Sequence, residues 1–164
     1  MAICKRLKDF LDKNKVQYQV AGHPEVYTAQ EIAAALHVPG KELAKVVIIK
    51  AVEDPTHRGE RFVMTVLPAS WRIDMARLKD ALKAKEINLA TEKEFESLFP
   101  DCEVGAMPPF GNLYGVDVYV DRALTEDEEI FFQAGNHIES IKMKYKDYSQ
   151  LVDPNIVEFG VHLH

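Results

Sequence analysis

The spacing of apolar residues predicts four helices. In residues 3–14 the apolar positions follow the i, i+4, i+7, i+8 pattern of an amphipathic helix. Thr28 and Thr91 are each followed three residues later by a glutamate, which is the signature of a capping box at a helix N-terminus. The four predicted helices are 3–14, 28–37, 73–83 and 91–99.

Runs of β-branched residues predict the strands. Segment 43–52 is apolar along most of its length, which is typical of a strand covered on both faces. Segment 61–67 follows a loop and is its predicted hairpin partner. Because strands and helices mix without a regular βαβ alternation, the predicted fold class is α+β around a mixed sheet. Shorter strands are expected at 16–20, 116–120, 129–133 and 140–143, followed by one or two helical turns at 146–152.

Length and composition bound the kind of protein. A chain of 164 residues with 47% hydrophobic and 28% charged residues is predicted to be a single globular domain, 1–164. There is no apolar run long enough for a membrane span and no signal-peptide pattern, so we expect a cytoplasmic protein with free thiols at Cys4 and Cys102. The net charge of −6 argues against a broad phosphate-neutralising face. Contact with a nucleic acid, if there is any, is expected to be local and weak.

Segment 102–111 cannot be an ordinary helix or a central strand. Gly105 has access to backbone angles that are closed to other residues, while Pro108 and Pro109 fix φ and offer no N–H. Two interpretations stay open. The segment is either a tight turn that only reverses the chain, or a rigid loop that presents backbone N–H groups to a ligand.

Lys45 and His137 are the side chains most suited to chemistry. Lys45 lies early in the most apolar strand and is either a snorkelling lysine or a cation presented to an anionic or carbonyl oxygen. Lys50, five residues on, is predicted to point to the opposite face. His137 is either a solvated turn residue, a general base or a pocket wall. Cys102 follows the predicted end of a helix, where no helix dipole favours a thiolate, and is interpreted as structural.

Several short motifs along the chain together resemble the YbaK/ProX family of aminoacyl-tRNA editing domains. No single motif is specific, but their order and spacing match the family over nearly the whole chain. They are His23-Pro24, Tyr27 to Ala33, Ala44 to Val47, Leu89 to Phe95, Gly105 to Gly111, Phe132 to His137 and Ile141 to Met143.

The resemblance implies a fold, an activity and a set of site residues. It implies a mixed, barrel-like β-sheet flanked by helices, and hydrolysis of the ester that joins a wrong amino acid to tRNA, without metal or cofactor. Mischarged tRNA-Pro carrying a small amino acid is the first expected substrate, with water positioned by a ribose hydroxyl of the substrate. Val46 stands where the alanine-editing branch usually has a polar residue, so the aminoacyl group stays open. The implied catalytic residues are Lys45 and Gly105, and the implied substrate-binding residues are Ala106, Met107, Pro108, Phe110, Gly135 and His137.

Expected partners follow from the same resemblance. We expect weak, salt-sensitive binding of the tRNA acceptor end, in which Lys45 contacts phosphate and Lys50, Lys142 or Lys144 is an optional further contact. Assistance from a synthetase is an option, and we expect a monomer that does not bind membranes. Two rival interpretations remain. The pocket belongs to a non-catalytic module that binds an amino acid, a nucleotide or a protein, or Cys102 serves a cysteine-dependent hydrolase.

Overall fold

The fold is organised around one long antiparallel strand pair in a mixed sheet. The computed structural model describes residues 4–53 and 59–162. Strand β2 (Ala44–Val52) pairs antiparallel with β3 (Arg61–Pro68), as the two apolar runs predicted. Strand β3 in turn pairs parallel with β6 (Asp117–Asp121), so the predicted mixed sheet and α+β class are confirmed. The full order is β5-β2-β3-β6-β9, with β5 at Glu86–Leu89 and β9 at Asn155–Val157.

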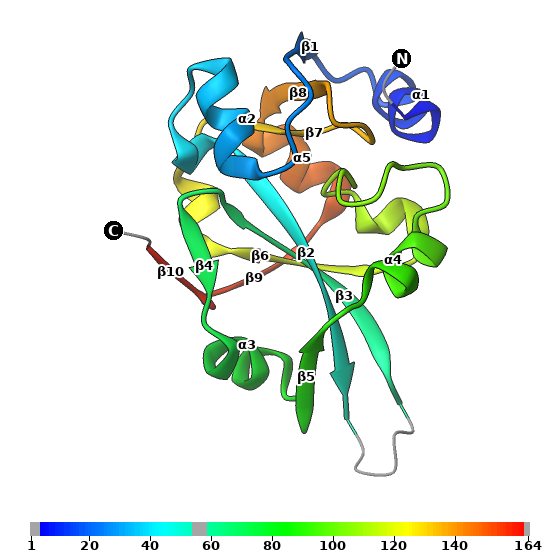
Figure 1. Cartoon of the computed structure of the whole chain (residues 1–164), viewed down its shortest axis with the longest axis vertical. Helices are drawn as coiled ribbons and strands as arrows, with labels where there is room; N and C mark the ends of the chain where they lie inside the picture. Colours follow the sequence, from blue (N-terminus) through cyan, green and yellow to red (C-terminus); the bar gives the residue numbers. More distant parts are fainter. Residues whose placement is uncertain (1–3, 54–58, 163–164) are drawn as a thin grey trace.

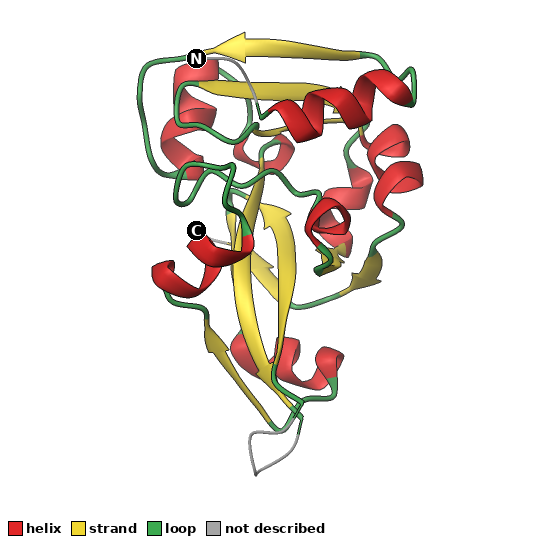
Figure 2. Ribbon diagram, turned by 90° about the vertical axis from the view of Figure 1, so that its right-hand side faces the viewer, coloured by secondary structure: helices red, strands yellow, loops and turns green. Residues whose placement is uncertain are grey.

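A smaller sheet of three strands lies at one end of the long pair. Its strands run across the direction of β2 and β3, with α1 beside them (Figures 1 and 2). Two strands, β4 (Trp71–Ile73) and β10 (Gly160–His162), pair separately. Strands β5 and β9 remain as edges of the five-stranded sheet, so the ladder does not close into a full barrel. The small sheet has the order β1-β8-β7, with β1 at Tyr18–Gly22, β8 at Glu139–Lys144 and β7 at Glu129–Gln133.

The predicted helix starts are confirmed by their capping geometry. The side chains of Thr28 and Thr91 each accept a hydrogen bond from the backbone N–H of the glutamate three residues on, at 3.1 and 3.2 Å. The helices are α1 (Lys5–Lys13), α2 (Ala29–Leu36), α3 (Met75–Leu82), α4 (Glu92–Leu98) and α5 (Tyr145–Val152), with 3-10 turns η1 (Gly40–Glu42), η2 (Gly111–Tyr114) and η3 (Arg122–Glu126). None of the helices in the described part of the chain is long and apolar enough to cross a bilayer.

The two faces of β2 pack into different apolar clusters, as expected for a strand covered on both sides. Ala44, Val46 and Ile48 pack in the cluster that includes α1, α5 and the small sheet. Val47 and Ile49 pack on the other side, in the cluster that includes α3. Because side chains alternate along a strand, every second residue of β2 faces the same cluster.

Asp121 joins the C-terminal strands to the large sheet. Its side chain is 3% exposed, and its Oδ2 accepts the backbone N–H groups of Phe159 at 2.9 Å and Gly160 at 2.6 Å. Its Oδ1 accepts the N–H of Ala123 at 2.9 Å. A buried carboxylate with three backbone donors stabilises the segment that passes from β9 to β10.

We expect Asp121→Asn to lower the free energy of unfolding by about 1–3 kcal/mol, because the amide NH₂ cannot accept the N–H groups that Oδ2 accepts. Asp117→Asn is the control on the same strand. Asp117 is exposed and forms only a surface ion pair with Arg61 at 3.5 Å, so its replacement is expected to cost less than about 1 kcal/mol. Urea denaturation measures both, and equal losses in the two variants would contradict the role of Asp121.

Candidate functional site

The candidate site is formed by two segments that are 30 residues apart in sequence and joined by backbone hydrogen bonds. The N–H of Glu103 donates to the carbonyl of Gly135 at 2.8 Å, and the N–H of Gly135 donates to the carbonyl of Ala106 at 2.9 Å. Gly105 and Gly135 have φ of +83° and +101°, angles that favour glycine. The structure therefore brings the two predicted glycines into one unit, made of segments 103–106 and 135–137.

Asn136 builds the turn that carries His137. Its side chain is buried, and its Oδ1 accepts the backbone N–H groups of Ile138 at 2.9 Å and Glu139 at 2.8 Å. The N–H of His137 donates to the carboxylate of Glu103 at 3.3 Å. These hydrogen bonds restrain the backbone of the turn at His137, and the backbone in turn fixes the position from which the imidazole ring extends.

The ring of His137 is buried and held at both of its nitrogens. The residue is 7% exposed, and its Nε2 lies 2.9 Å from the carbonyl of Val104, so Nε2 carries the proton and donates. In that neutral tautomer Nδ1 accepts from the amide of Gln133 at 3.5 Å. Both ring nitrogens have partners, so neither is free to accept a proton in this arrangement, and the pocket wall stays a prediction.

Tyr27 adds an aromatic surface that the sequence reasoning missed. Its ring centroid lies 4.6 Å from that of His137 at an interplanar angle of 53°, and 62% of the residue is exposed. A tyrosine just before a capping box carries no signal of a ligand contact by itself. Its position over His137 is visible only in the folded chain.

The loop offers backbone donors that no protein group uses. Within residues 4–53 and 59–162, the N–H groups of Val104, Gly105 and Met107 donate to no acceptor. Val104 and Gly105 are exposed, whereas Ala106 is buried. The arrangement can hold a carbonyl oxygen or an anion at the exposed part of the loop.

The other predicted binding residues support the loop from behind. Met107 and Phe110 are buried in the main apolar cluster, and Pro108 is buried as well. The hydroxyl of Tyr148, which is fully buried, donates to the carbonyl of Pro109 at 2.7 Å. These contacts position the backbone of the loop, and they place the Met107 and Phe110 side chains in the core.

Lys45 and Lys50 differ in their surroundings. Lys50 Nζ lies 3.2 Å from Glu94 Oε2 and 3.9 Å from Glu60 Oε2, so its charge is balanced. Lys45 is half-buried, its pKa is lowered by that burial, and no carboxylate of a described residue lies within ion-pair distance of it. By strand alternation Lys45 shares its face with Val47, whose cluster lies on the other side of β2 from the cluster that holds Met107 of the loop. That Lys45 and Gly105 act in one site stays a prediction.

Cys102 does not have the surroundings of a nucleophile. Burial raises the pKa of its thiol to about 12, where a reactive cysteine needs a lowered value. It lies beyond the C-terminal end of α4, as predicted. The cysteine-dependent hydrolase therefore has no support from the geometry.

Comparison with known proteins decides the family. The chain matches the aminoacyl-tRNA editing domain over residues 23–151. The chain belongs to this family. The assignment made from the sequence motifs is thereby confirmed, and residues 103–106 and 135–137 lie within the matched region of this editing-domain protein.

Relatives of the editing-domain protein include free-standing and synthetase-borne sequences. It is 25% identical over 156 residues to the Multifunctional Ser/Thr-tRNA deacylase ProXp-y of Escherichia coli K12, covering 94% of this chain and 91% of that protein. It is 30% identical over 101 residues to the Proline--tRNA ligase of Bacillus subtilis, covering 62% of this chain and 16% of the ligase. A solved structure of a candidate trans-editing enzyme for prolyl tRNA synthetase superposes with a TM-score of 0.80 at 17% identity, covering 96% of each chain, and shows the same fold.

We expect Gly135→Ala to disrupt the joined loop and turn. A Cβ at Gly135 would lie 2.8 Å from Cys4 Cβ at a φ of +101°. Gly115→Ala is the matched control, because its φ is +70° but nothing lies within 4 Å of the added atom. Gly115→Ala should cost about 1–2 kcal/mol of unfolding free energy. Gly135→Ala should cost about 1–3 kcal/mol more, owing to the added overpacking, as measured by thermal and urea denaturation. Equal costs would show that Cys4 moves aside freely.

Proposed function

We propose that this editing-domain protein is a trans-acting aminoacyl-tRNA deacylase. Its reaction is hydrolysis of the ester of a mischarged tRNA, with a small amino acid on tRNA-Pro as the first substrate class. The observation that carries the proposal is the set of unpaired N–H groups on loop 103–107 beside the His137 wall. Membership of the aminoacyl-tRNA editing domain family supports the same reaction class.

The loop performs the chemical step by binding charge that develops on the ester carbonyl. As water attacks the carbonyl carbon, the oxygen becomes an oxyanion, which the N–H groups of Gly105 and Met107 stabilise. One such donor is commonly worth about 3 kcal/mol of transition-state stabilisation. The attacking water loses a proton, the ribose oxygen leaves and takes one up, and a ribose hydroxyl of the substrate positions the water. An aminoacyl ester is already activated, so no covalent nucleophile is needed.

The two lysines of β2 differ in whether a carboxylate balances their charge. Lys50 is paired with Glu94, whereas Lys45 has no carboxylate partner among the described residues. We assign Lys45 to a phosphate of the tRNA acceptor end rather than to the ester carbonyl, because strand alternation puts it on the face of β2 that carries Val47, opposite the cluster that holds Met107 of the loop. With a net charge of −6, binding of tRNA should be weak and sensitive to salt. The protein acts as a monomer, and a synthetase that holds the same tRNA would raise its local concentration.

Selectivity in this proposal comes from size. A pocket distinguishes one methylene by only about 1–3 kcal/mol, so a synthetase accepts some smaller amino acids that a second, tighter site must remove. His137 lies beside Gly105, and the exposed ring of Tyr27 packs against the His137 ring. Their rings limit how large an aminoacyl group fits beside Gly105.

The experiment that tests the proposed function is hydrolysis of a panel of mischarged tRNAs. Wild-type protein should cleave one small-residue ester. Lys45→Ala should lose at least about tenfold in kcat/KM, corresponding to one phosphate contact of about 1.4 kcal/mol. Lys50→Ala, the control on the same strand, should retain activity once its folding is verified. An absence of hydrolysis for every tRNA by folded wild-type protein would overturn the proposal.

His137→Ala should widen the range of aminoacyl groups that are cleaved. The expected change is a gain for larger residues of about tenfold or more relative to the original substrate, because a wall of the pocket is removed. The measurement is the ratio of kcat/KM values across the same panel. An unchanged range in a folded variant would remove His137 from this role.

A non-catalytic binding module is the second candidate function. The observation in its favour is that Lys45 shares a face of β2 with Val47, opposite the cluster that holds Met107 of the loop. Such a module would hold mischarged tRNA or a free amino acid without turnover. Binding without hydrolysis in the panel above would favour it.

A further inference from the structure

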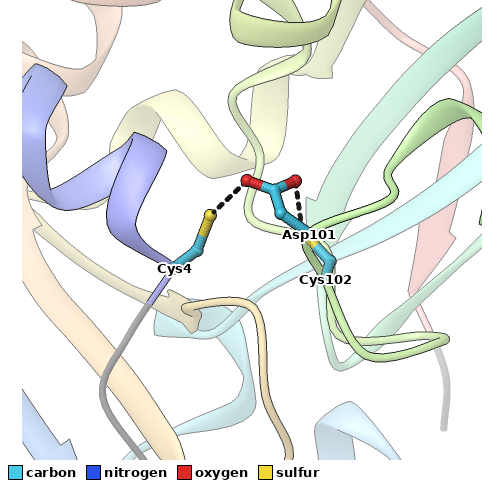
Figure 3. Close-up of side chains that lie close together, drawn as sticks. All are labelled: Cys4, Asp101 and Cys102. Atoms are coloured by element: carbon cyan, nitrogen blue, oxygen red, sulfur yellow. Dashed lines mark hydrogen bonds between the residues drawn. The ribbon is translucent and has the colours of Figure 1, made fainter.

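Cys4, Asp101 and Cys102 converge behind the loop, although 97 residues separate Cys4 from Asp101 (Figure 3). The Cys4 thiol donates to Asp101 Oδ2 at 3.0 Å, and the Cys102 thiol lies 3.9 Å from Asp101 Oδ1. One donor atom from each of the three residues lies within 4.8 Å of the other two. These are the only cysteines of the chain, and both are free thiols.

We propose that Cys4, Asp101 and Cys102 form a binding site for a thiophilic divalent cation of the Zn²⁺ class. Thiolate sulfur and carboxylate oxygen are ligands that Zn²⁺ takes in tetrahedral sites. With metal–ligand distances of about 2.3 Å to sulfur and about 2.1 Å to oxygen, neighbouring donors in a tetrahedron lie roughly 3.5–3.8 Å apart. The Cys4 and Cys102 sulfurs lie 3.0 Å from Asp101 Oδ2 and 3.9 Å from Asp101 Oδ1, respectively, and the three donors lie within 4.8 Å of one another. Small side-chain rotations suffice to enclose an ion, and water completes the coordination.

Two neighbouring residues, Tyr114 and Arg6, hold the Asp101 carboxylate from outside the three ligands. Tyr114 Oη donates to Asp101 Oδ1 at 2.8 Å and lies 3.4 Å from Cys102 Sγ. Arg6 Nε lies 3.5 Å from Asp101 Oδ2, and its guanidinium stacks 4.5 Å from the centre of the Tyr114 ring. Outer groups that orient a ligating carboxylate are typical of protein metal sites.

The charges also balance. Binding releases one proton from each thiol, so two thiolates and one carboxylate contribute −3 and the divalent cation contributes +2. The remaining −1 lies beside the guanidinium of Arg6. A half-buried site that is neutral as a whole avoids the cost of an isolated charge.

The proposed site lies between the start of α1 and the start of the loop. Cys4 is the residue directly before the first turn of α1, and its N–H donates to the carbonyl of Ala134 at 2.9 Å. Asp101 and Cys102 directly precede Glu103, the first residue of the loop. An ion held by these residues ties α1 to the start of the loop and restrains the loop from behind, whatever the substrate of the site in front.

The test is a titration of the reduced, full-length protein with Co²⁺ and then with Zn²⁺. Bound Co²⁺ should show sulfur-to-metal charge-transfer absorption and the visible bands of a tetrahedral site, and Zn²⁺ should displace it. Zn²⁺ should also raise the thermal unfolding temperature of the wild-type protein. A reducing agent that does not bind metal keeps a disulfide between the two cysteines from forming.

Three variants assign the ligands. Cys4→Ser and Cys102→Ser should each abolish the charge-transfer band or shift it. These two variants and Asp101→Asn should each weaken metal binding by more than about 100-fold. Loss of a residue that only orients a ligand typically weakens binding by about 10- to 100-fold. Asp9→Asn, an exposed aspartate of α1, is the control and should bind as wild type does. Asp101→Asn preserves shape, so it tests the site even where a serine variant fails to fold.

Two results would overturn the proposal. Folded wild-type protein could show no charge-transfer absorption at any Co²⁺ concentration below that which precipitates it. Alternatively, binding could persist unchanged in Cys4→Ser and Asp101→Asn, which would place the ion elsewhere, for instance on the histidines near the C-terminus. Because the readout is metal binding, neither result depends on deacylase activity.

Discussion

The pairing of segment 103–106 with the turn at 135–137 is the constraint on which the rest of the site depends. Two backbone hydrogen bonds join the carbonyl and N–H of Gly135 to Glu103 and Ala106. Once these are made, the N–H groups of Val104, Gly105 and Met107 have no partner within the described structure, and the His137 ring lies beside Gly105. A loop that is rigid because of its backbone can present donors without the help of catalytic side chains.

The supports of this pairing come from distant parts of the chain. Tyr148 of α5 holds the carbonyl of Pro109, and Asn136 closes the turn by accepting two N–H groups. Cys4, at the start of α1, packs against Gly135 so closely that only a glycine fits there. The loop is therefore held from three sides, and this preorganisation suits a reaction in which a carbonyl oxygen gains charge.

The absence of a nucleophile in the proposed mechanism agrees with the chemistry of the substrate. An aminoacyl ester is reactive towards water, so the enzyme needs to position the ester and stabilise the oxyanion. The acidic net charge agrees with the proposed contact with a few phosphates of the acceptor end rather than with the body of a tRNA. The proposed cation site would make the loop more rigid, because two of its ligands, Asp101 and Cys102, directly precede Glu103.

Local features were determined by the sequence alone. Both capping boxes, the two long strands and the glycine–proline loop follow from short-range sterics and periodicity, which act within a few residues. The family motifs pointed to Gly105, Gly135 and His137, and the structure brings these three together. Strands such as β5 and β9, at 86–89 and 155–157, are too short to give a periodic signal, and their pairing comes from neighbours far along the chain.

Only the tertiary structure decided which distant side chains meet. Strand alternation predicted that Lys45 and Lys50 point to opposite faces. Packing decided which apolar cluster each face of β2 contacts, and it placed Glu94 beside Lys50. Tyr27 meets His137, and Cys4 meets Asp101, because helices α1 and α2 dock on sheets formed by later residues. Such contacts depend on how whole elements pack, and no local pattern of residues encodes them. The sequence determined the elements and the loop, and the packing of those elements determined the site.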